Sequence, residues 1–351
     1  MRVTIDKSII DQYDTVQVPL DCFRKFLIIM EYKGYVLDTD SAISFDEIVS
    51  KLNYNDQKLF EGIITRSVNH IERHSSDCIV VVGGETECIQ KHFSIYEIEE
   101  YLGTAATVIV ENGMNDGLFV RAIMKHFATE IDFEKQLSNS LVAIDPASGS
   151  GARSRIEYFL NIHHDQPKYL RCLVIVDGDK RFPEDNTYGG YQTQQNDGAY
   201  FQSKNVTYHV LEKRAMENYM PDEVYDSHRN VFGNNWVDAY LRLTEEQKNY
   251  YYIASGFLKD IPKTMRNDES KKRDRTQSLS AEIQTVFSTI TDDDYLTLLT
   301  NPYIGGNFKD EFPKHYNDSQ VTKQSLLRRS PVRPNGKSEL EEIAEEIIQL
   351  L

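Results

Sequence analysis

Two apolar runs in this chain end abruptly in carboxylates. The run 107–110 (Thr-Val-Ile-Val) leads into Glu111, and the run 172–176 (Cys-Leu-Val-Ile-Val) leads into an Asp-Gly-Asp tripeptide at 177–179. Short β-branched runs without polar alternation are typical of strands buried on both faces of a parallel sheet, and ligands gather at the carboxyl ends of such strands. The sequence therefore predicts that these carboxylates converge at one edge of a sheet.

Such a set of carboxylates requires a counter-charge. Acidic groups that are crowded together repel one another and are driven toward protonation unless a cation neutralises them. Hard divalent cations bind through oxygen ligands of this kind. Glu111, Asp177 and Asp179 therefore indicate a metal site, for which Mg²⁺ is the first choice and Mn²⁺ the second. The alternative interpretation of residues 177–179 is an acidic surface turn.

Further carboxylates follow at related positions. Asp116 lies at the start of the helix expected after Glu111, where it can face the same cation. After a fourth expected strand, Glu212 stands at the strand end and Glu217 in a helix-like turn. Asp145 ends another apolar run and is a further candidate, although an acidic residue before proline is as often a turn former.

Basic residues lie beside the carboxylates in the sequence. Lys180, Lys213 and Arg214 are candidates for binding a scissile phosphate, or equally for salt bridges to the carboxylates. The run 149–151 (Gly-Ser-Gly) opens a helix, as a phosphate-binding loop does, but it matches no nucleotide-binding pattern. A nucleotide cofactor is therefore not expected.

The acidic motifs resemble a known family. The Glu111 motif, the tripeptide 177–179 and the run 211–221 (Leu-Glu-Lys-Arg-Ala-Met-Glu-Asn-Tyr-Met-Pro) are similar to the Toprim domain of topoisomerases, primases and OLD-type (overcoming lysogenization defect) nucleases. The last run is similar to the OLD-like branch. The resemblance covers residues 104–225 well and residues 240–351 more loosely.

The resemblance implies a nuclease that cleaves phosphodiester bonds with divalent metal ions. Two ions about 3.5–4 Å apart can activate water and stabilise the leaving oxygen. The resemblance implies a catalytic set and a metal-binding set that share four carboxylates. The catalytic set is Glu111, Asp177, Asp179, Glu217 and Lys180, and the metal-binding set is Glu111, Asp116, Asp177, Asp179 and Glu217.

Two features depart from the family pattern. OLD proteins usually carry an ATPase before the Toprim domain, whereas this chain has no G-x-x-x-x-G-K-[ST] pattern. The spacing from Glu111 to Asp116 is also one residue longer than the commonest form. The first departure implies a standalone nuclease that acts with a separate ATPase partner, as an anti-phage defence effector.

Other functions stay open at this stage. A housekeeping Toprim enzyme in RNA maturation or DNA repair is one alternative, and an inactive metal-binding regulatory subunit is another. A topoisomerase is disfavoured because no tyrosine-bearing cleavage domain is recognisable. The sequence does not distinguish a DNA substrate from an RNA substrate, and it leaves a homo-oligomer possible.

Composition narrows the class of protein. The 351 residues carry a formal charge of −16, which argues against a generic nucleic-acid coat but not against a nuclease whose metals cancel acidic charge. No apolar run approaches the roughly 20 residues of a membrane span, and the amino terminus lacks a signal-peptide pattern. The four cysteines form no C-x-x-C pair and are expected to be reduced core residues. A cytoplasmic protein without membrane contact is expected.

Hydrophobic periodicity divides the chain into three regions. Residues 1–103 are expected to be mainly helical, with one strand at 78–82. Residues 104–225 alternate strands and helices, which predicts an α/β fold with a Toprim-like, mainly parallel sheet flanked by helices. A polar loop is expected at 183–200. Residues 226–351 form a helical extension whose last helix begins at a Ser338/Glu341 capping box.

Overall fold

The computed structural model of the protein describes residues 1–9, 20–39, 45–70, 78–82, 91–147, 151–186 and 189–351. Most of the glycine-rich run 149–151 lies outside these residues. Among the helices in the described ranges, none is both long and apolar enough to cross a bilayer.

The larger sheet is built from the strands that the sequence predicts. It contains β5 (Ala106–Val110), β6 (Val142–Pro146), β7 (Cys172–Val176) and β8 (Thr207–Val210) in the order β6-β5-β7-β8. Every neighbouring pair is parallel. The predicted α/β fold with a mainly parallel sheet is therefore confirmed.

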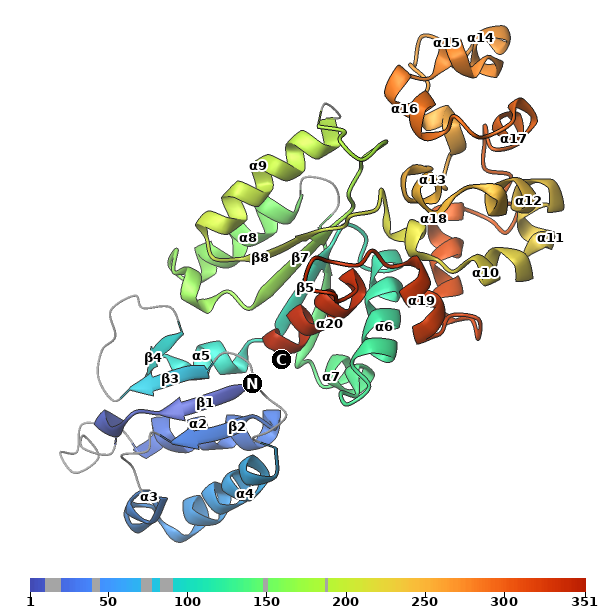
Figure 1. The fold of residues 1–351 in the computed structure, drawn as a ribbon. Helices are drawn as coiled ribbons and strands as arrows, with labels where there is room; N and C mark the ends of the chain where they lie inside the picture. Colours follow the sequence, from blue (N-terminus) through green and yellow to red (C-terminus); the bar gives the residue numbers. More distant parts are fainter. Residues whose placement is uncertain (10–19, 40–44, 71–77, 83–90, 148–150, 187–188) are drawn as a thin grey trace.

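Helices cover both faces of this sheet (Figure 1). On one face lie α6 (Asn115–Phe127) and α20 (Glu339–Leu350), and on the other lie α8 (Gly151–Ile162) and α9 (Gly189–Ser203). Successive side chains of β7 enter the two layers alternately, because a strand turns neighbouring residues to opposite faces. The fully buried runs seen in the sequence follow from this three-layer packing.

The predicted polar loop at 183–200 is wrong. Helix α9 occupies its second half, and Phe201 in the last turn of that helix is completely buried against the sheet. The segment is rich in Gly, Asn and Gln, so its sequence lacks a marked apolar stripe. Tertiary packing overrides this low propensity.

The amino-terminal region has its own sheet. The strands β1 (Arg2–Ile5), β2 (Val36–Thr39), β3 (Cys78–Val82) and β4 (His92–Ser94) run parallel in the order β2-β1-β3-β4. Helices that pack on it within the described residues include α2 (Leu20–Lys33), α3 (Phe45–Lys51), α4 (Tyr54–His70) and α5 (Ile98–Gly103). Helices supply most of its regular structure, as expected, but only β3 of its four strands is recognisable in the sequence.

Residues 226–351 are chiefly helical, as predicted. A hydrophobic core extends without interruption from β5 to α20, across the boundary at residues 225 and 226. The remaining helices are α7 (Phe133–Ser138), η2 (Pro167–Tyr169), η3 (Met216–Tyr219), α10 (Asp222–Ser227), α11 (Arg229–Phe232), α12 (Asn234–Arg242), α13 (Glu245–Tyr250), η4 (Gly256–Lys259), α14 (Glu269–Arg273), α15 (Arg275–Ser278), α16 (Ala281–Val286), α17 (Asp292–Thr297), α18 (Phe308–Glu311), η5 (Phe312–Asn317) and α19 (Lys323–Arg329).

The last helix is attached to the sheet by a buried carboxylate. Glu339, at the start of α20, has no exposed surface. Its Oε1 accepts hydrogen bonds from His209 Nε2 at 3.1 Å and from the Glu212 backbone N–H at 2.9 Å, and its Oε2 accepts one from Tyr219 Oη. Burial lowers the pKa of His209, but hydrogen bonds to Glu339 and Glu346 outweigh burial and raise that pKa to about 9.

The His209 network makes stability depend on pH. Because the pKa of His209 is higher in the folded chain than its ordinary value of 6.5, its contribution is complete below pH 6.5 and is lost as the pH rises through 9. The loss amounts to about 3 kcal/mol for a shift of this size. Glu346→Gln should reduce the decline in the free energy of unfolding between pH 6.5 and 9, measured by urea denaturation.

Glu345→Gln provides the control for this measurement. Glu345 is next to Glu346 on α20 but pairs at the surface with Lys337. This variant should keep the wild-type decline. Equal pH profiles for wild type and Glu346→Gln would contradict the assignment of the decline to His209.

Candidate active site

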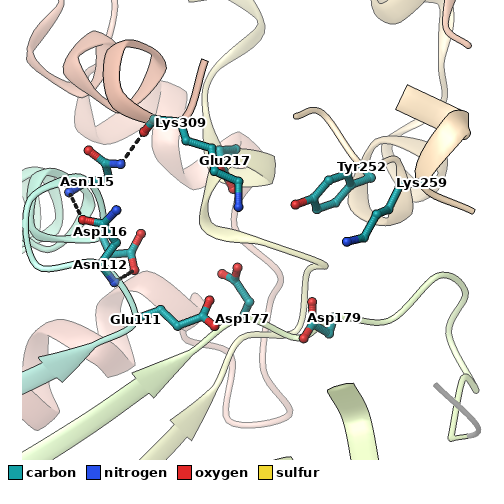
Figure 2. A pocket seen from close by; sticks show the side chains of 10 residues that line it. All are labelled: Glu111, Asn112, Asn115, Asp116, Asp177, Asp179, Glu217, Tyr252, Lys259 and Lys309. Atoms are coloured by element: carbon teal, nitrogen blue, oxygen red, sulfur yellow. Dashed lines mark hydrogen bonds between the residues drawn. The ribbon is translucent and has the colours of Figure 1, made fainter. Parts of the chain in front are cut away.

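A cavity of about 310 Å³ opens at the carboxyl edge of β5 and β7. All five carboxylates that the family resemblance assigns to metal binding line it (Figure 2). The complete lining consists of Glu111, Asn112, Asn115, Asp116, Asp177, Asp179, Glu217, Tyr252, Lys259 and Lys309. The structure therefore brings together residues from five separate parts of the chain.

The sheet places the first carboxylates. Glu111 directly follows β5 and Asp177 directly follows β7, and these two strands are hydrogen-bonded neighbours. Figure 2 shows both side chains, with Asp179 beside them, at the strand ends. The predicted convergence of Glu111, Asp177 and Asp179 at one edge is therefore seen.

The tripeptide 177–179 continues alongside the segment after β8. The backbone N–H groups of Gly178 and Asp179 donate to the carbonyls of Lys213 at 3.1 Å and Arg214 at 2.8 Å. A Cβ atom at Gly178 would overlap the carbonyl oxygens of Leu211 and Lys213. The glycine thus makes room for the neighbouring backbone.

Asp179 has a backbone conformation that side-chain-bearing residues seldom adopt. Its φ of 54° lies in the left-handed region, which aspartate tolerates better than most residues. Backbone of this kind persists where the surrounding structure enforces it, and it is frequent at functional sites. Here the hydrogen bond from the Asp179 backbone N–H to the Arg214 carbonyl accompanies this conformation.

Asp177 also positions the segment that carries Glu217. Its Oδ1 accepts a hydrogen bond of 2.9 Å from the backbone N–H of Met216, the first residue of η3. The next residue, Glu217, is thereby held at the cavity opposite Glu111 (Figure 2). The Asp177 carboxylate therefore has a structural contact in addition to its exposure to the cavity.

Two asparagines organise the turn between β5 and α6. The Asn112 backbone N–H donates to Asp116 Oδ2 at 2.7 Å, which orients the Asp116 carboxylate. Asn115 Nδ2 donates to the carbonyl of Lys309. This contact ties α18 to α6 and brings Lys309 to the cavity wall (Figure 2).

The electrostatic environment opposes ionisation. Burial, followed by repulsion from the other cavity carboxylates with Glu217 first among them, raises the pKa of Asp177 well above its ordinary value. Burial and the charges of Glu217 and Glu111 raise the pKa of Asp116 to about 7. Asp177 keeps some accessible surface because it borders the cavity. Protein encloses its other sides, so loss of hydration is the largest cause of its raised pKa.

The pKa values of the remaining carboxylates, Glu217 and Asp179, are raised as well. Burial raises the pKa of Glu217, and burial together with Glu111 raises that of Asp179. Lys259 and Lys309, which also line the cavity, lower the pKa of Asp179. Two lysines among the lining residues do not balance five carboxylates, so ionisation of the whole set requires additional cations.

The donor set fits a hard divalent cation. The cavity offers carboxylate and amide oxygens, which Mg²⁺ and Mn²⁺ prefer, and no histidine or cysteine. No three of the described cavity carboxylates place oxygens within 4.8 Å of one another. One ion held by three of them would therefore require side-chain rotation.

The basic candidates from the sequence do not line the cavity. Lys213 is 2% exposed and donates to the Asn218 carbonyl at 3.1 Å, and Arg214 is 1% exposed and forms two hydrogen bonds to Asp260 at 2.7 and 2.9 Å. Both are structural residues. Of the two roles that the sequence leaves open for Arg214, the structure therefore shows the salt bridge, with Asp260 as its partner. Lys180 is not among the lining residues.

The two remaining carboxylate candidates have other partners. Asp145 Oδ2 accepts a hydrogen bond of 2.6 Å from Arg155 Nε, and Glu212 pairs with Arg333. Neither lines the cavity. Asp145, at the end of β6, is therefore a carboxylate outside the cavity whose substitution can serve as a control for substitutions of the cavity carboxylates.

Several lining residues were not found by sequence analysis. Tyr252, Lys259 and Lys309 come from the helical extension, and no local pattern distinguishes them from other surface residues. Asn112 and Asn115 stand between Glu111 and Asp116 and could have been proposed from that position.

Comparisons of the chain with protein-family models, with curated proteins and with solved structures found no match.

The raised pKa values predict how the metal-free protein responds to pH. The pKa of Asp116 is about 7 in the folded chain and near 3.8 when unfolded, so between these values the folded state binds more protons. The free energy of unfolding should therefore fall as the pH rises from 4 to 7. Asp116→Asn should flatten this decline, measured by urea denaturation in the presence of a chelator.

Asp145→Asn is the matched control and should leave the wild-type decline in place. Saturating Mg²⁺ should stabilise the wild type most above pH 7, where the carboxylates are ionised. A steeper decline in Asp116→Asn than in wild type would refute this account of the cavity.

Proposed function

We propose that this protein is a divalent-metal-dependent nuclease that cleaves phosphodiester bonds of DNA or RNA. One observation carries the proposal: carboxylates from β5, β7, α6 and η3 share a single open cavity that also contains two lysines. Oxygen ligands for divalent ions beside cationic groups are the arrangement that phosphodiester hydrolysis uses. The similarity of residues 104–225 to Toprim nucleases supports the same reaction.

The acidic residues have separate parts in this proposal. Glu111 and Asp177 would hold one ion, and Asp179 and Glu217 a second, with Asp116 beside them. Divalent ions bound there supply Lewis-acid polarisation and neutralise the charge that develops on a phosphate ester. The hydrogen bond from Met216 to Asp177 keeps the Glu217 segment in place, so the set is organised before substrate binds.

Two lysines that line the cavity would bind the nucleic acid backbone. Lys259 and Lys309 carry the positive charge nearest the carboxylates, and the Tyr252 hydroxyl is directed toward them in Figure 2. Ammonium groups bind phosphate oxygens as point charges. The two lysines therefore replace Lys180 as the proposed phosphate ligands.

A separate ATPase is the proposed regulatory partner. The chain contains no phosphate-binding loop of the G-x-x-x-x-G-K-[ST] type, so it does not supply that activity itself. A nuclease that acts with a separate ATPase is consistent with antiviral defence, which is the proposed biological role.

Cleavage should require the carboxylates. Glu111→Gln and Asp177→Asn should each abolish cleavage of supercoiled DNA, linear DNA and structured RNA, because the metal ligands are lost. Asp145→Asn, at the neighbouring strand end, should cleave as wild type does. Assays should contain Mg²⁺, Mn²⁺ or chelator, with and without the candidate ATPase.

Cleavage that survives Asp177→Asn, or that continues in chelator, would exclude a metal mechanism at this cavity. Absence of wild-type cleavage under every condition would favour the regulatory-subunit alternative.

The lysines of the wall should affect catalysis without affecting the fold. Lys309→Ala should lower kcat/KM roughly 100-fold, because a cationic group that faces the developing charge is removed. Lys180→Ala, outside the cavity, should lower it little. A larger loss in Lys180→Ala than in Lys309→Ala would restore the assignment made from sequence.

A further inference from the structure

Outside the candidate active site, two imidazoles and a carboxylate face one another. His228, His315 and Asp318 each offer one ligand atom, and these atoms all lie within 4.8 Å of one another. Asp318 Oδ2 lies 3.5 Å from His228 Nε2 and 3.0 Å from His315 Nδ1. The two imidazole rings are 4.1 Å apart between centroids.

The three residues come from two parts of the helical extension. His228 joins α10 to α11, whereas His315 is in η5 and Asp318 ends that helix. The cluster therefore connects segments almost 90 positions apart in the chain. None of its members lines the cavity of the candidate active site.

The spacing suits a tetrahedral ion. Two ligands of a zinc ion with bonds of about 2.0–2.1 Å lie about 3.3–3.4 Å apart, because a tetrahedral edge is about 1.63 times the bond length. The distances from Asp318 Oδ2 to the two imidazoles, 3.5 and 3.0 Å, lie on either side of this value. Small side-chain rotations would accommodate the ion.

The hydrogen bonds of His228 select the ligand atom. Its Nδ1 lies 2.9 Å from both the Val224 carbonyl and Ser227 Oγ. The Ser227 hydroxyl already donates to that carbonyl, so both neighbours can only accept and Nδ1 must carry the proton. In the neutral ring, Nε2 then turns a lone pair toward the Asp318 carboxylate.

Two acceptors that face each other require a proton or a cation between them. A backbone carbonyl that accepts from the other ring nitrogen is the usual outer partner of a metal-bound histidine. The side chains of His228 and Asp318 are 26% and 25% exposed, and that of His315 is 15% exposed. Solvent therefore reaches the cluster, and water can complete the coordination.

We propose that His228, His315 and Asp318 bind one zinc-type transition metal ion. Imidazole nitrogen favours Zn²⁺ over Mg²⁺, whereas carboxylate oxygen also suits Mg²⁺ and Mn²⁺, so in excess Mg²⁺ the histidine cluster is the site expected to take Zn²⁺. When the ion is bound, neutral His315 keeps its proton on Nε2 and ligates through Nδ1. This proposal does not depend on the nuclease activity.

Binding of the ion would stabilise the wall of the active-site cavity. The residue after His315, Tyr316, donates from its hydroxyl to the Met216 carbonyl at 2.6 Å, beside Glu217. Helix α18, which carries Lys309, directly precedes η5. An ion that joins η5 to the α10–α11 turn therefore holds both segments together.

Metal titration of the full chain tests the proposal. After chelator treatment and dialysis into excess Mg²⁺, which occupies the carboxylate cavity, calorimetric titration with ZnCl₂ should show one ion bound per chain, and Co²⁺ should give the visible absorption of a nitrogen-containing tetrahedral site. Zn²⁺ should also raise the Tm. His228→Gln and His315→Gln should each weaken Zn²⁺ binding at least tenfold, abolish the Co²⁺ absorption and remove the rise in Tm.

Two control variants make the result specific. His163→Gln alters a histidine that pairs with one carboxylate, Glu100, at 2.7 Å, and it should bind Zn²⁺ as wild type does. Asp177→Asn should also retain Zn²⁺ binding, which separates this site from the proposed nuclease centre. If the wild type binds no Zn²⁺, if either His228→Gln or His315→Gln retains full affinity while folded by circular dichroism, or if Asp177→Asn loses binding, the proposal is wrong.

Discussion

Electrostatic repulsion among the carboxylates of one cavity is the constraint on which the rest of the structure depends. Asp177 and Glu217 are half-buried where they border the cavity, and burial raises the pKa of both. Without a bound cation, the fold must either keep protons on these groups or accept their repulsion. Holding the carboxylates close together lowers the stability of the metal-free chain. It also raises the affinity for divalent ions, because the carboxylates are already in place before an ion binds.

The surrounding structure resists this repulsion with backbone contacts. Gly178 lets two chain segments approach closely, and Asp177 accepts a hydrogen bond from Met216. The buried Glu339 attaches α20 to the sheet through His209. The helical extension shares a core with the sheet and supplies part of the cavity wall, including Lys309. It is therefore part of the site and not only an appendage to it.

The sequence reveals the parts of the site that depend on local patterns. Glu111 and Asp177 were predictable because each ends a β-branched run that is buried on both faces. Lys309 was not, since only tertiary packing against α6 brings it to the cavity. Strand β1 was missed because four residues of alternating burial give a weak signal. For Arg214 the sequence left a phosphate ligand and a salt bridge equally open, because it does not show the buried partner, Asp260.

The central claim is that the cavity carboxylates bind divalent cations, and proton release tests it most directly. Calorimetric titration with Mg²⁺ in two buffers of different ionisation enthalpy measures the protons released on binding. Because the pKa of Asp116 is about 7 in the metal-free chain, release should be larger at pH 6.5 than at pH 8.5. Mg²⁺ binding without proton release at pH 6.5, or no binding at either pH, would contradict the account.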